Sequence, residues 1–227
     1  MCKRNHHAGM LHRPRKAPLR TALAVAAAIL AFGCGDPDPN WVNDRLLPPE
    51  PVLTYCVGAQ VEDFCLDDTD GTSHSIEAYR GHIVVLEFWG CRCPHVERTE
   101  KARQRLIAHY APRDVVYLAV DSNRDEYPEE IRQYLADHGS SYTILLDFAS
   151  EIARRFNASR TPQVFALDGD GVVRYIGRPF SSEQWARDEP ERADWLEAAI
   201  DALLAGQSPD PAMRPPVGSK IRKLPPP

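Results

Sequence analysis

The sequence predicts an α/β domain with a central mixed β-sheet flanked by helices. Between residues 83 and 167, runs of apolar and β-branched residues alternate with segments of helical periodicity, as strands and helices do in layered domains. The segment Asp168-Gly169-Asp170-Gly171 then predicts a tight hairpin between two further strands. This closing hairpin adds antiparallel strands, so we expect a mixed sheet.

The first half of the domain begins with a turn and a buried strand. Asp70-Gly71 marks a tight turn and indicates an N-terminal hairpin extension. Residues 83–89 are apolar except for one glutamate, which predicts a buried strand. Apolar and small residues recur at helical spacing from Val96 to Tyr110, and residues 115–120 predict a second buried strand.

The second half continues the alternation. Pro128 suits a first helical position and Gly139 a helix cap, which predicts a helix between them. We expect the other elements, a strand, a short helix, the two hairpin strands and a last helix, at 142–146, 149–156, 163–167, 172–176 and 190–206.

Composition divides the chain into a compact part and two polar flanks. The chain has 227 residues and a net charge of -5, with no basic block beyond the N-terminus, which argues against a nucleic-acid partner. Residues 34–55 are rich in Pro, Asp and Asn and predict a tether. Residues 56–206 form the expected domain. Residues 207–227 hold seven prolines and are expected to be disordered.

The N-terminus, residues 1–33, resembles a secretory signal. Basic residues precede an apolar run of 11 residues, 22–32, which is too short to span a bilayer comfortably. Cys34 follows a small residue, as in a bacterial lipoprotein signal, although Ala31 stands where Leu is usual. We therefore expect export to the periplasmic face of a membrane, with a lipid anchor on Cys34. Plain cleavage of the signal, or an uncleaved anchor, stays open.

The chemistry is expected at Cys93. This cysteine follows the buried strand and precedes Pro94, which fits a first helical turn because its missing N–H is not needed there. The free N–H groups of a helix start favour a thiolate over a thiol, and the thiolate is the species that attacks disulfides and peroxides. The alternative is a buried, inert thiol.

A family resemblance rests on several motifs. The motifs lie at 57–64, 70–71, 79–81, 83–89 and 93–94, and Thr161-Pro162 followed by 163–165 matches the family's cis-proline strand. Together they resemble the thioredoxin-like redoxins, of the TlpA/ResA or AhpC/TSA type, over residues 57–206. The resemblance implies a thioredoxin-like fold and an antioxidant or thiol-disulfide enzyme that needs no cofactor.

The resemblance also implies roles for individual residues. Cys93 falls on the attacking cysteine, and the Pro94-His95 pair is similar to the DsbA type, in which His95 would add a hydrogen bond or a positive charge near the sulfur. Pro162, if cis, would lie against Cys93, and Thr161 would touch substrate.

Two residues of the strand before Cys93 are further candidates. Glu87 falls on a buried carboxylate of the family, whose raised pKa would suit proton transfer to a leaving thiolate. A solvent-facing Glu87 is the alternative. Trp89 is expected to pack and to shape the substrate groove.

The chain departs from the family at the resolving cysteine, because Val96 stands where a Cys-x-x-Cys motif has its second cysteine. Cys91 is the expected substitute, although residues two apart in an extended strand lie about 6.6 Å apart at Cα, near the limit for a disulfide. A one-cysteine mechanism, or resolution by Cys56 or Cys65, stays open. Cys56 and Cys65 form either a structural disulfide or a second redox pair.

The leading hypothesis is an exported thiol-disulfide oxidoreductase that acts on protein thiols and disulfides. A thiol peroxidase is the alternative, although the Thr and Pro of the peroxiredoxin motif are replaced by Gly90 and Leu86. A Cu(I) module using Cys91, Cys93 and His95 is less favoured, because a helix start would turn His95 away from the two sulfurs; we expect no metal site. A redox-inactive binding domain is the fourth option.

Overall fold

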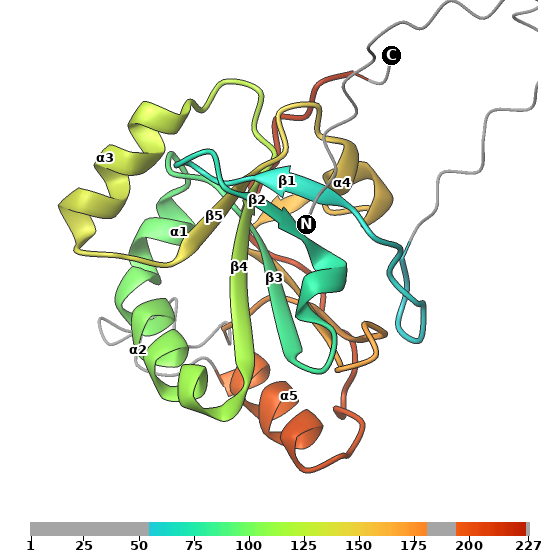
Figure 1. Cartoon of the computed structure of the whole chain (residues 1–227). Coiled ribbons are helices and arrows are strands. Elements are labelled where there is room, and N and C mark those ends of the chain that lie inside the picture. Colours follow the sequence, from blue (N-terminus) through green and yellow to red (C-terminus); the bar gives the residue numbers. More distant parts are fainter. Residues whose placement is uncertain (1–54, 181–193, 226–227) are drawn as a thin grey trace, which may run out of the picture. The chain divides into compact units, whose positions relative to one another are not determined.

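The structure, a computed structural model, describes residues 55–180 and 194–225. The predicted signal, most of the tether, Cys34 and the expected start of the last helix at Pro190 lie outside these residues. A five-stranded sheet of order β5-β4-β3-β7-β8 forms the centre of the described part (Figure 1).

The sheet is mixed, as predicted. Strand β3 (Ile83–Trp89) pairs in parallel with β4 (Val115–Asp121), which pairs in parallel with β5 (Thr143–Leu146). On its other side, β3 pairs in antiparallel fashion with β7 (Gln163–Leu167), which continues through the hairpin into β8 (Val173–Gly177).

Helices cover one face of the sheet, and helix and hairpin cover the other. The first face packs against four helices: α1 (Pro94–Arg98), α2 (Glu100–Tyr110), α3 (Pro128–His138) and α5 (Asp194–Leu204). The second face packs against helix α4 (Glu151–Arg155), the hairpin of strands β1 (Cys65–Asp67) and β2 (Ser73–Ser75), and the short helix η1 (Ile76–Tyr79). A second short turn, η2 (Ala111–Arg113), connects α2 to β4.

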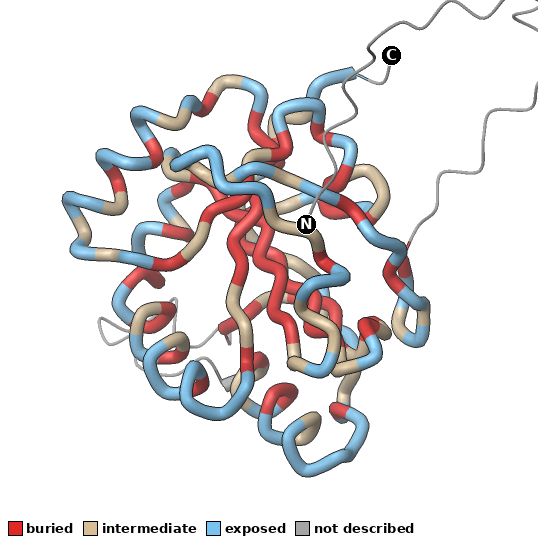
Figure 2. The backbone as a smooth tube through the Cα atoms, viewed as in Figure 1, coloured by how far each residue is buried: buried red, intermediate tan, exposed pale blue. Residues whose placement is uncertain are grey.

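Strand β3 is central because both of its faces are apolar. Leu86 and Phe88 face the core that includes α4, while Val85 and Trp89 face the helices of the other layer, and all four are fully buried. Figure 2 shows the buried backbone concentrated in the central strands, while the outer helices are exposed on one side. The strand therefore holds its carboxyl end, where Cys93 follows, in a fixed place.

The helix after Cys93 is broken, whereas the sequence predicts one run to Tyr110. Thr99 stands between α1 and α2 with ψ near 3°, and its hydroxyl donates to the carbonyls of His95 and Val96. A side chain that occupies these carbonyls competes with the helical ladder and bends the chain.

The prediction that residues 207–227 are disordered is wrong for 207–225. This segment first runs beside β8, where Ile176 exchanges backbone hydrogen bonds with Ala212 and Arg214, and it then forms β9 (Ser219–Lys220). Strand β9 pairs with β6 (Arg160–Thr161), and Ile221 is buried in the core beyond it. Prolines suit such an extended segment, because it needs few backbone donors.

The N-terminal hairpin predicted from Asp70-Gly71 is confirmed as β1 and β2. A disulfide between Cys56 and Cys65 is not formed. Cys56 is a free, exposed thiol, and Cys65 pairs in β1 with Ser75. The chain between the two cysteines turns at residues 57–58 and then runs beside β8 through a Gln60–Val172 bridge. The predicted structural disulfide between these two cysteines is therefore wrong for this structure, and a redox role for them stays a prediction.

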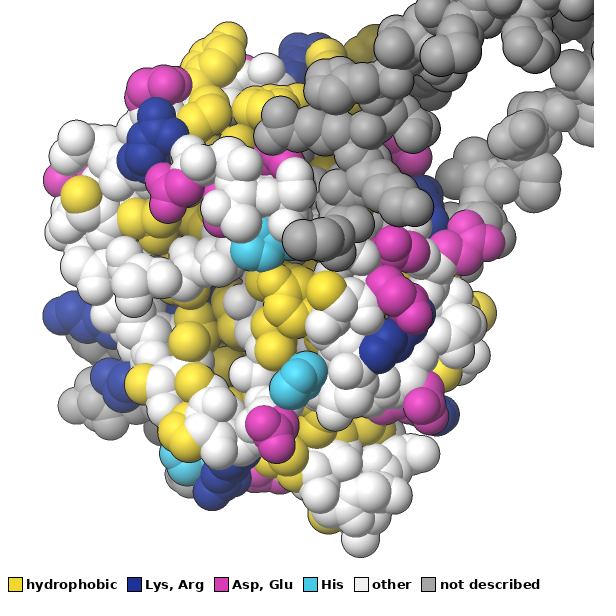
Figure 3. All heavy atoms as spheres, viewed as in Figure 1, with side chains coloured by type: hydrophobic (Ala, Val, Ile, Leu, Met, Phe, Trp, Pro, Cys, Tyr) yellow, Lys and Arg dark blue, Asp and Glu magenta, His cyan; other side chains and the backbone are white. Residues whose placement is uncertain are grey.

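The described surface is of mixed charge. On the face drawn in Figure 3, acidic and basic side chains are scattered between apolar ones rather than gathered by sign. Among the described residues, none of the helices has the length and apolar character needed to cross a bilayer.

Candidate active site

Cys93 lies at the carboxyl end of the sheet, immediately before α1. It is the N-cap residue of α1, and Pro94 is the first helical residue, as predicted. Its Sγ is within hydrogen-bond distance of the carbonyl oxygen of Thr161, at 3.1 Å, and of the hydroxyl oxygen of Ser219, at 3.2 Å. Only 4% of Cys93 is exposed.

The loop opposite Cys93 contains a cis peptide bond between Thr161 and Pro162, the isomer expected from the resemblance. This places the Thr161 carbonyl within reach of the Cys93 sulfur. Thr161 is 1% exposed and Pro162 is also buried, so in this structure neither residue offers the open contact with substrate that the sequence suggested.

The covering element is the C-terminal strap, which we define as residues 217–223. Its strand β9 pairs antiparallel with β6, with Arg160 opposite Lys220 and Thr161 opposite Ser219. The strap therefore pairs with the short strand β6 beside the cis-proline. It also brings the hydroxyl of Ser219 into contact with the Cys93 sulfur. The residues of the strap lie within 207–227, the segment that the sequence analysis expected to be disordered.

Cys91 occupies an acidic environment. Its backbone N–H donates to Oε2 of Glu126 at 2.6 Å, and Glu126 itself is 2% exposed. Burial raises the pKa of the Cys91 thiol, and the nearby Glu126, Asp121 and Glu130 carboxylates raise it further. This thiol stays protonated at neutral pH and is a poor nucleophile.

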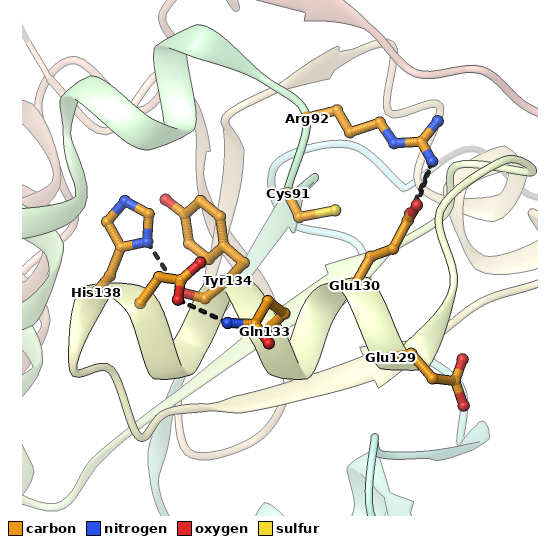
Figure 4. Close-up of a pocket in the computed structure, with 8 residues that line it drawn as sticks. Cys91, Arg92, Glu129, Glu130, Gln133, Tyr134 and His138 are labelled. Carbon is orange, nitrogen blue, oxygen red and sulfur yellow. Dashed lines mark hydrogen bonds and ion pairs between the residues drawn. The ribbon is translucent and has the colours of Figure 1, made fainter.

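Cys91 also faces a groove along α3. The groove is lined by Cys91, Arg92, Tyr134, His138 and further polar residues of α3. In Figure 4 the Cys91 sulfur points toward the part of α3 that carries Glu130, and Arg92 reaches past it to this carboxylate. The Arg92–Glu130 distance is 2.6 Å, and a second ion pair joins Arg92 to Asp125 at 3.6 Å. Arg92 is therefore committed to carboxylates and not to either sulfur.

Asp121 ends β4 beside the same cysteine. It is 4% exposed, and its Oδ1 accepts hydrogen bonds from the backbone and side-chain nitrogens of Asn123. Burial, followed by the charge of Glu126, raises the pKa of Asp121 to about 8. The structure thus brings two buried carboxyl groups close to Cys91, and desolvation and like charge favour the protonated form of Asp121.

Glu87 is buried, as the family resemblance implied, and does not face solvent. It is not an isolated charge, because it forms an ion pair with Arg103. Both of its oxygens accept hydrogen bonds from Arg103 of α2, at 2.7 and 2.9 Å, and Arg103 also reaches Glu100 at 2.6 Å. Burial raises the pKa of Glu87, and the Arg103 guanidinium opposes that shift. A carboxylate held by two charged hydrogen bonds is better suited to fixing α2 on β3 than to carrying protons.

Two other predicted substrate-binding residues differ in exposure. Trp89 is fully buried and packs edge-on against Tyr134, with ring centroids 5.1 Å apart, so it does not line a groove. His95 is half-buried, and burial together with Arg98 lowers its pKa. His95 is therefore neutral at pH 7 and does not supply the positive charge that the sequence suggested.

The described residues contain no group of three His, Cys, Asp or Glu side chains placed to hold a metal ion. The side chains of Cys91, Cys93 and His95 therefore do not form the Cu(I) ligand set considered from the sequence. This geometry does not favour a metal-binding module.

Sequence reasoning missed several residues of the site. A glutamate inside an apolar strand needs a cation, and this requirement could have pointed to Arg103 on the following helix. Ser219, Gly218 and Arg222 carried no comparable signal, because the proline-rich composition around them is typical of disorder as well as of an extended docked segment.

Comparisons with known proteins agree with this geometry. The model of the AhpC/TSA family matches residues 57–176. The chain is 31% identical over 120 residues to the thiol-disulfide oxidoreductase ResA of Geobacillus kaustophilus, covering 53% of this chain and 68% of that protein.

Two solved structures show the fold. An uncharacterized conserved protein from Geobacillus kaustophilus is 26% identical with a TM-score of 0.69, and the match covers 76% of this chain and 94% of that one. The thioredoxin domain of a thiol-disulfide oxidoreductase from Bacteroides vulgatus is 15% identical with a TM-score of 0.52, covering 66% and 99%. The family model matches more than half of the chain over a thioredoxin-like sheet, and this chain therefore belongs to the AhpC/TSA family and is an oxidoreductase.

Proposed function

We propose that this protein exchanges thiols and disulfides through Cys93 and acts on disulfide-bonded proteins or peptides. The observation that carries the proposal is the contact of the Cys93 sulfur with the carbonyl of Thr161, beside cis-Pro162. This places the only thiol at the start of α1 against a short strand edge, β6, that pairs with an extended segment. An edge of this kind binds peptide backbones by adding a strand.

The exchange balances without a cofactor. The Cys93 thiolate attacks one sulfur of a substrate disulfide, a bond forms between the two sulfurs, and the other substrate sulfur leaves as a thiolate. A second thiolate then attacks the mixed disulfide and releases Cys93. Each step moves one disulfide bond, so no electrons are gained or lost overall.

The second thiol is the open part of the cycle. That Cys91 supplies it stays a prediction, and two observations weigh against it: its raised pKa and its position in the groove along α3. The arrangement favours a one-cysteine cycle in which the second thiol comes from the substrate or from a separate reductant.

A peroxide reaction at Cys93 has less support. The peroxiredoxin pattern needs Thr where this chain has Gly90, and a Cβ atom there would lie 2.6 Å from the side-chain nitrogen of Asn123. Leu86, in place of the Pro of the pattern, is fully buried in the core. The residues that shape a peroxide site are thus absent, and a Thr at position 90 would require the Asn123 side chain to shift.

We also propose that the protein is exported and held at the periplasmic face of a membrane through lipid on Cys34. The signal-like residues 1–33 support this proposal. Expression of the full chain in a bacterium with labelled palmitate tests it. Label on the native chain and none on Cys34→Ala is expected, and label on neither would reject the anchor.

The function is tested by trapping the mixed disulfide. The reduced protein is mixed with a peptide disulfide, quenched with acid, and analysed by mass spectrometry after digestion. We expect the peptide on Cys93 and none on Cys91. Trapping on another cysteine, or a sulfenic acid on Cys93 formed faster with peroxide than the mixed disulfide with peptide, would overturn the proposal.

A further inference from the structure

The edge beside Cys93 is occupied by a segment of the same chain, the strap. Strand β9 in the strap extends the two-residue β6 strand in antiparallel register, and the carbonyl of Ser159 accepts a further hydrogen bond from the N–H of Ile221. Any extended peptide that binds this edge must use the same backbone groups. The strap and a peptide are therefore mutually exclusive here.

The residue in contact with the nucleophile is a serine, which differs from cysteine only in having oxygen in place of sulfur. Ser219 lies opposite Thr161, and its Oγ is 3.2 Å from the Cys93 sulfur. A disulfide under attack must bring its own sulfur to the Cys93 sulfur. The Ser219 hydroxyl therefore stands where the attacked sulfur of a substrate would stand.

The residue before Ser219 explains how the strap comes so close. Gly218 has φ of +144°, and a Cβ atom at this position would lie 2.1 Å from the carbonyl oxygen of Thr161. The side chain of Arg160 in turn donates to the Gly218 carbonyl at 3.1 Å. Only glycine fits this approach, because any side chain would push the strap off the edge.

Arg222 fastens the other end of the strap. Its guanidinium pairs with Asp125 at 2.6 Å and with the buried Glu126 at 2.7 Å. Its backbone N–H donates to the Asn123 side chain, and its carbonyl accepts from the N–H of Arg124. These contacts tie the strap to the loop after β4, next to Cys91, so the strap bridges the two loops that flank the Cys93 sulfur.

We propose that the strap is an intramolecular substrate mimic, and that a disulfide-bearing peptide reaches Cys93 by displacing residues 218–220 from β6. The inference rests on the proposed thiol-disulfide exchange. It also specifies the substrate: an extended segment with glycine directly before the attacked cysteine, matching Gly218-Ser219.

The test uses a peptide Val-Gly-Cys-Lys whose cysteine is disulfide-bonded to 5-thio-2-nitrobenzoate. Attack by the Cys93 thiolate on the cysteine sulfur forms the mixed disulfide and releases the coloured thiolate, which gives the rate. Mass spectrometry identifies the product. The matched probe Val-Leu-Cys-Lys, with the same leaving group, reports the preference for glycine.

We compare the full chain with Arg222→Ala, which removes the ion pairs, and with Gly218→Ala, which blocks the close approach. Arg132→Ala is the control, because this exposed arginine of α3 pairs with Glu129 and does not touch the strap. We expect the peptide rate to rise at least tenfold in both strap variants and to match the native rate in the control. The glycine probe should react several-fold faster than the leucine probe in the native chain.

An unchanged rate in a folded Arg222→Ala variant would overturn the inference, and this variant carries the test if Gly218→Ala does not fold. Equal rates for the two probes would reject the proposed preference for glycine. The outcomes also separate the inference from the function. If no variant forms a mixed disulfide at Cys93 with either probe, the thiol-disulfide exchange itself fails.

A second experiment tests whether the strap occupies the site in solution. Ser219→Cys is treated with oxidised glutathione, which accepts the two electrons and two protons released when a disulfide forms. We expect a bond from the introduced sulfur to Cys93, formed much faster than in Ser208→Cys, where the exposed position lies outside the strap. Equal or absent cross-linking would show that the strap does not lie on Cys93.

Discussion

Both carboxylate oxygens of Glu87 are held by the guanidinium of Arg103, at 2.7 and 2.9 Å, with both side chains fully buried. The pair joins helix α2 to the central strand β3, the strand that precedes the loop with Cys93. It belongs to a larger buried network, because Glu100 also receives hydrogen bonds from Tyr134, Ser140 and Tyr142. The arrangement indicates a role in holding the site rather than in moving protons.

We therefore expect Glu87→Gln to lower stability more than turnover. Removing one partner of a buried ion pair leaves the other charge uncompensated, which costs about 3 kcal/mol of unfolding free energy. Urea unfolding measures this loss, and the rate of mixed-disulfide formation measures activity. Glu129→Gln, which breaks an exposed pair with Arg132, is the control and should change stability by less than about 1 kcal/mol. A large loss of rate with unchanged stability would restore the proton-transfer role.

Asp121→Asn should flatten the pH dependence of stability. The folded-state pKa of Asp121 is raised to about 8 by burial and by Glu126, so its contribution is fully present below about pH 4 and is lost as the pH rises through 8. Asparagine keeps the acceptor oxygen and does not ionise. Urea midpoints at about pH 5 and about pH 9 should fall less in the variant than in the native protein. Parallel losses in both proteins would contradict the buried, protonated state.

Cys91 should resist alkylation. Its pKa is raised by burial and by Glu126, so little thiolate is present at neutral pH, whereas Cys56 is exposed. After brief treatment with iodoacetamide and digestion, mass spectrometry should show full modification of Cys56 and little of Cys91. Glu126→Gln should speed the Cys91 reaction several-fold. Modification of Cys91 as fast as Cys56 would revive it as a resolving thiol.

Replacing the nucleophile gives the plainest result. Cys93→Ser should reduce thiol-disulfide exchange to below about 1% of the native rate, because a hydroxyl does not attack disulfides. Cys56→Ser is the matched control and should retain full activity, because this exposed thiol makes none of the contacts that hold the Cys93 sulfur, which go to Thr161 and Ser219. Activity that survives in Cys93→Ser would mean that another cysteine is the nucleophile.

Local signals in the sequence predicted the sheet and the place of the nucleophile. The hairpin at Asp168–Gly171, the buried strand before Cys93 and the cap at Gly139 depend on neighbouring residues, and the structure confirms them. The break at Thr99 was missed, because a single hydroxyl bonding to two carbonyls leaves the apolar spacing intact.

Contacts between residues far apart in the chain could not be predicted from the sequence. Ser219 and Cys93 are 126 residues apart, and Arg222 meets Glu126 across 96, so no local pattern links them. The exposed state of Cys56 has the same origin, because the path of the chain along β8 decides which cysteines meet. Spacing alone could not show whether Cys56 and Cys65 pair with each other.

The position of the strap also orders events in time. A chain emerges N-terminus first, both from the ribosome and from a secretion channel, so the residues of the sheet, of α1 and of the cis-proline loop precede Ser219. Residues 217–223 can therefore cover the Cys93 thiol only after every other part of the site has emerged. The strap is thus the part of the site that takes its place last, after the sulfur that it covers.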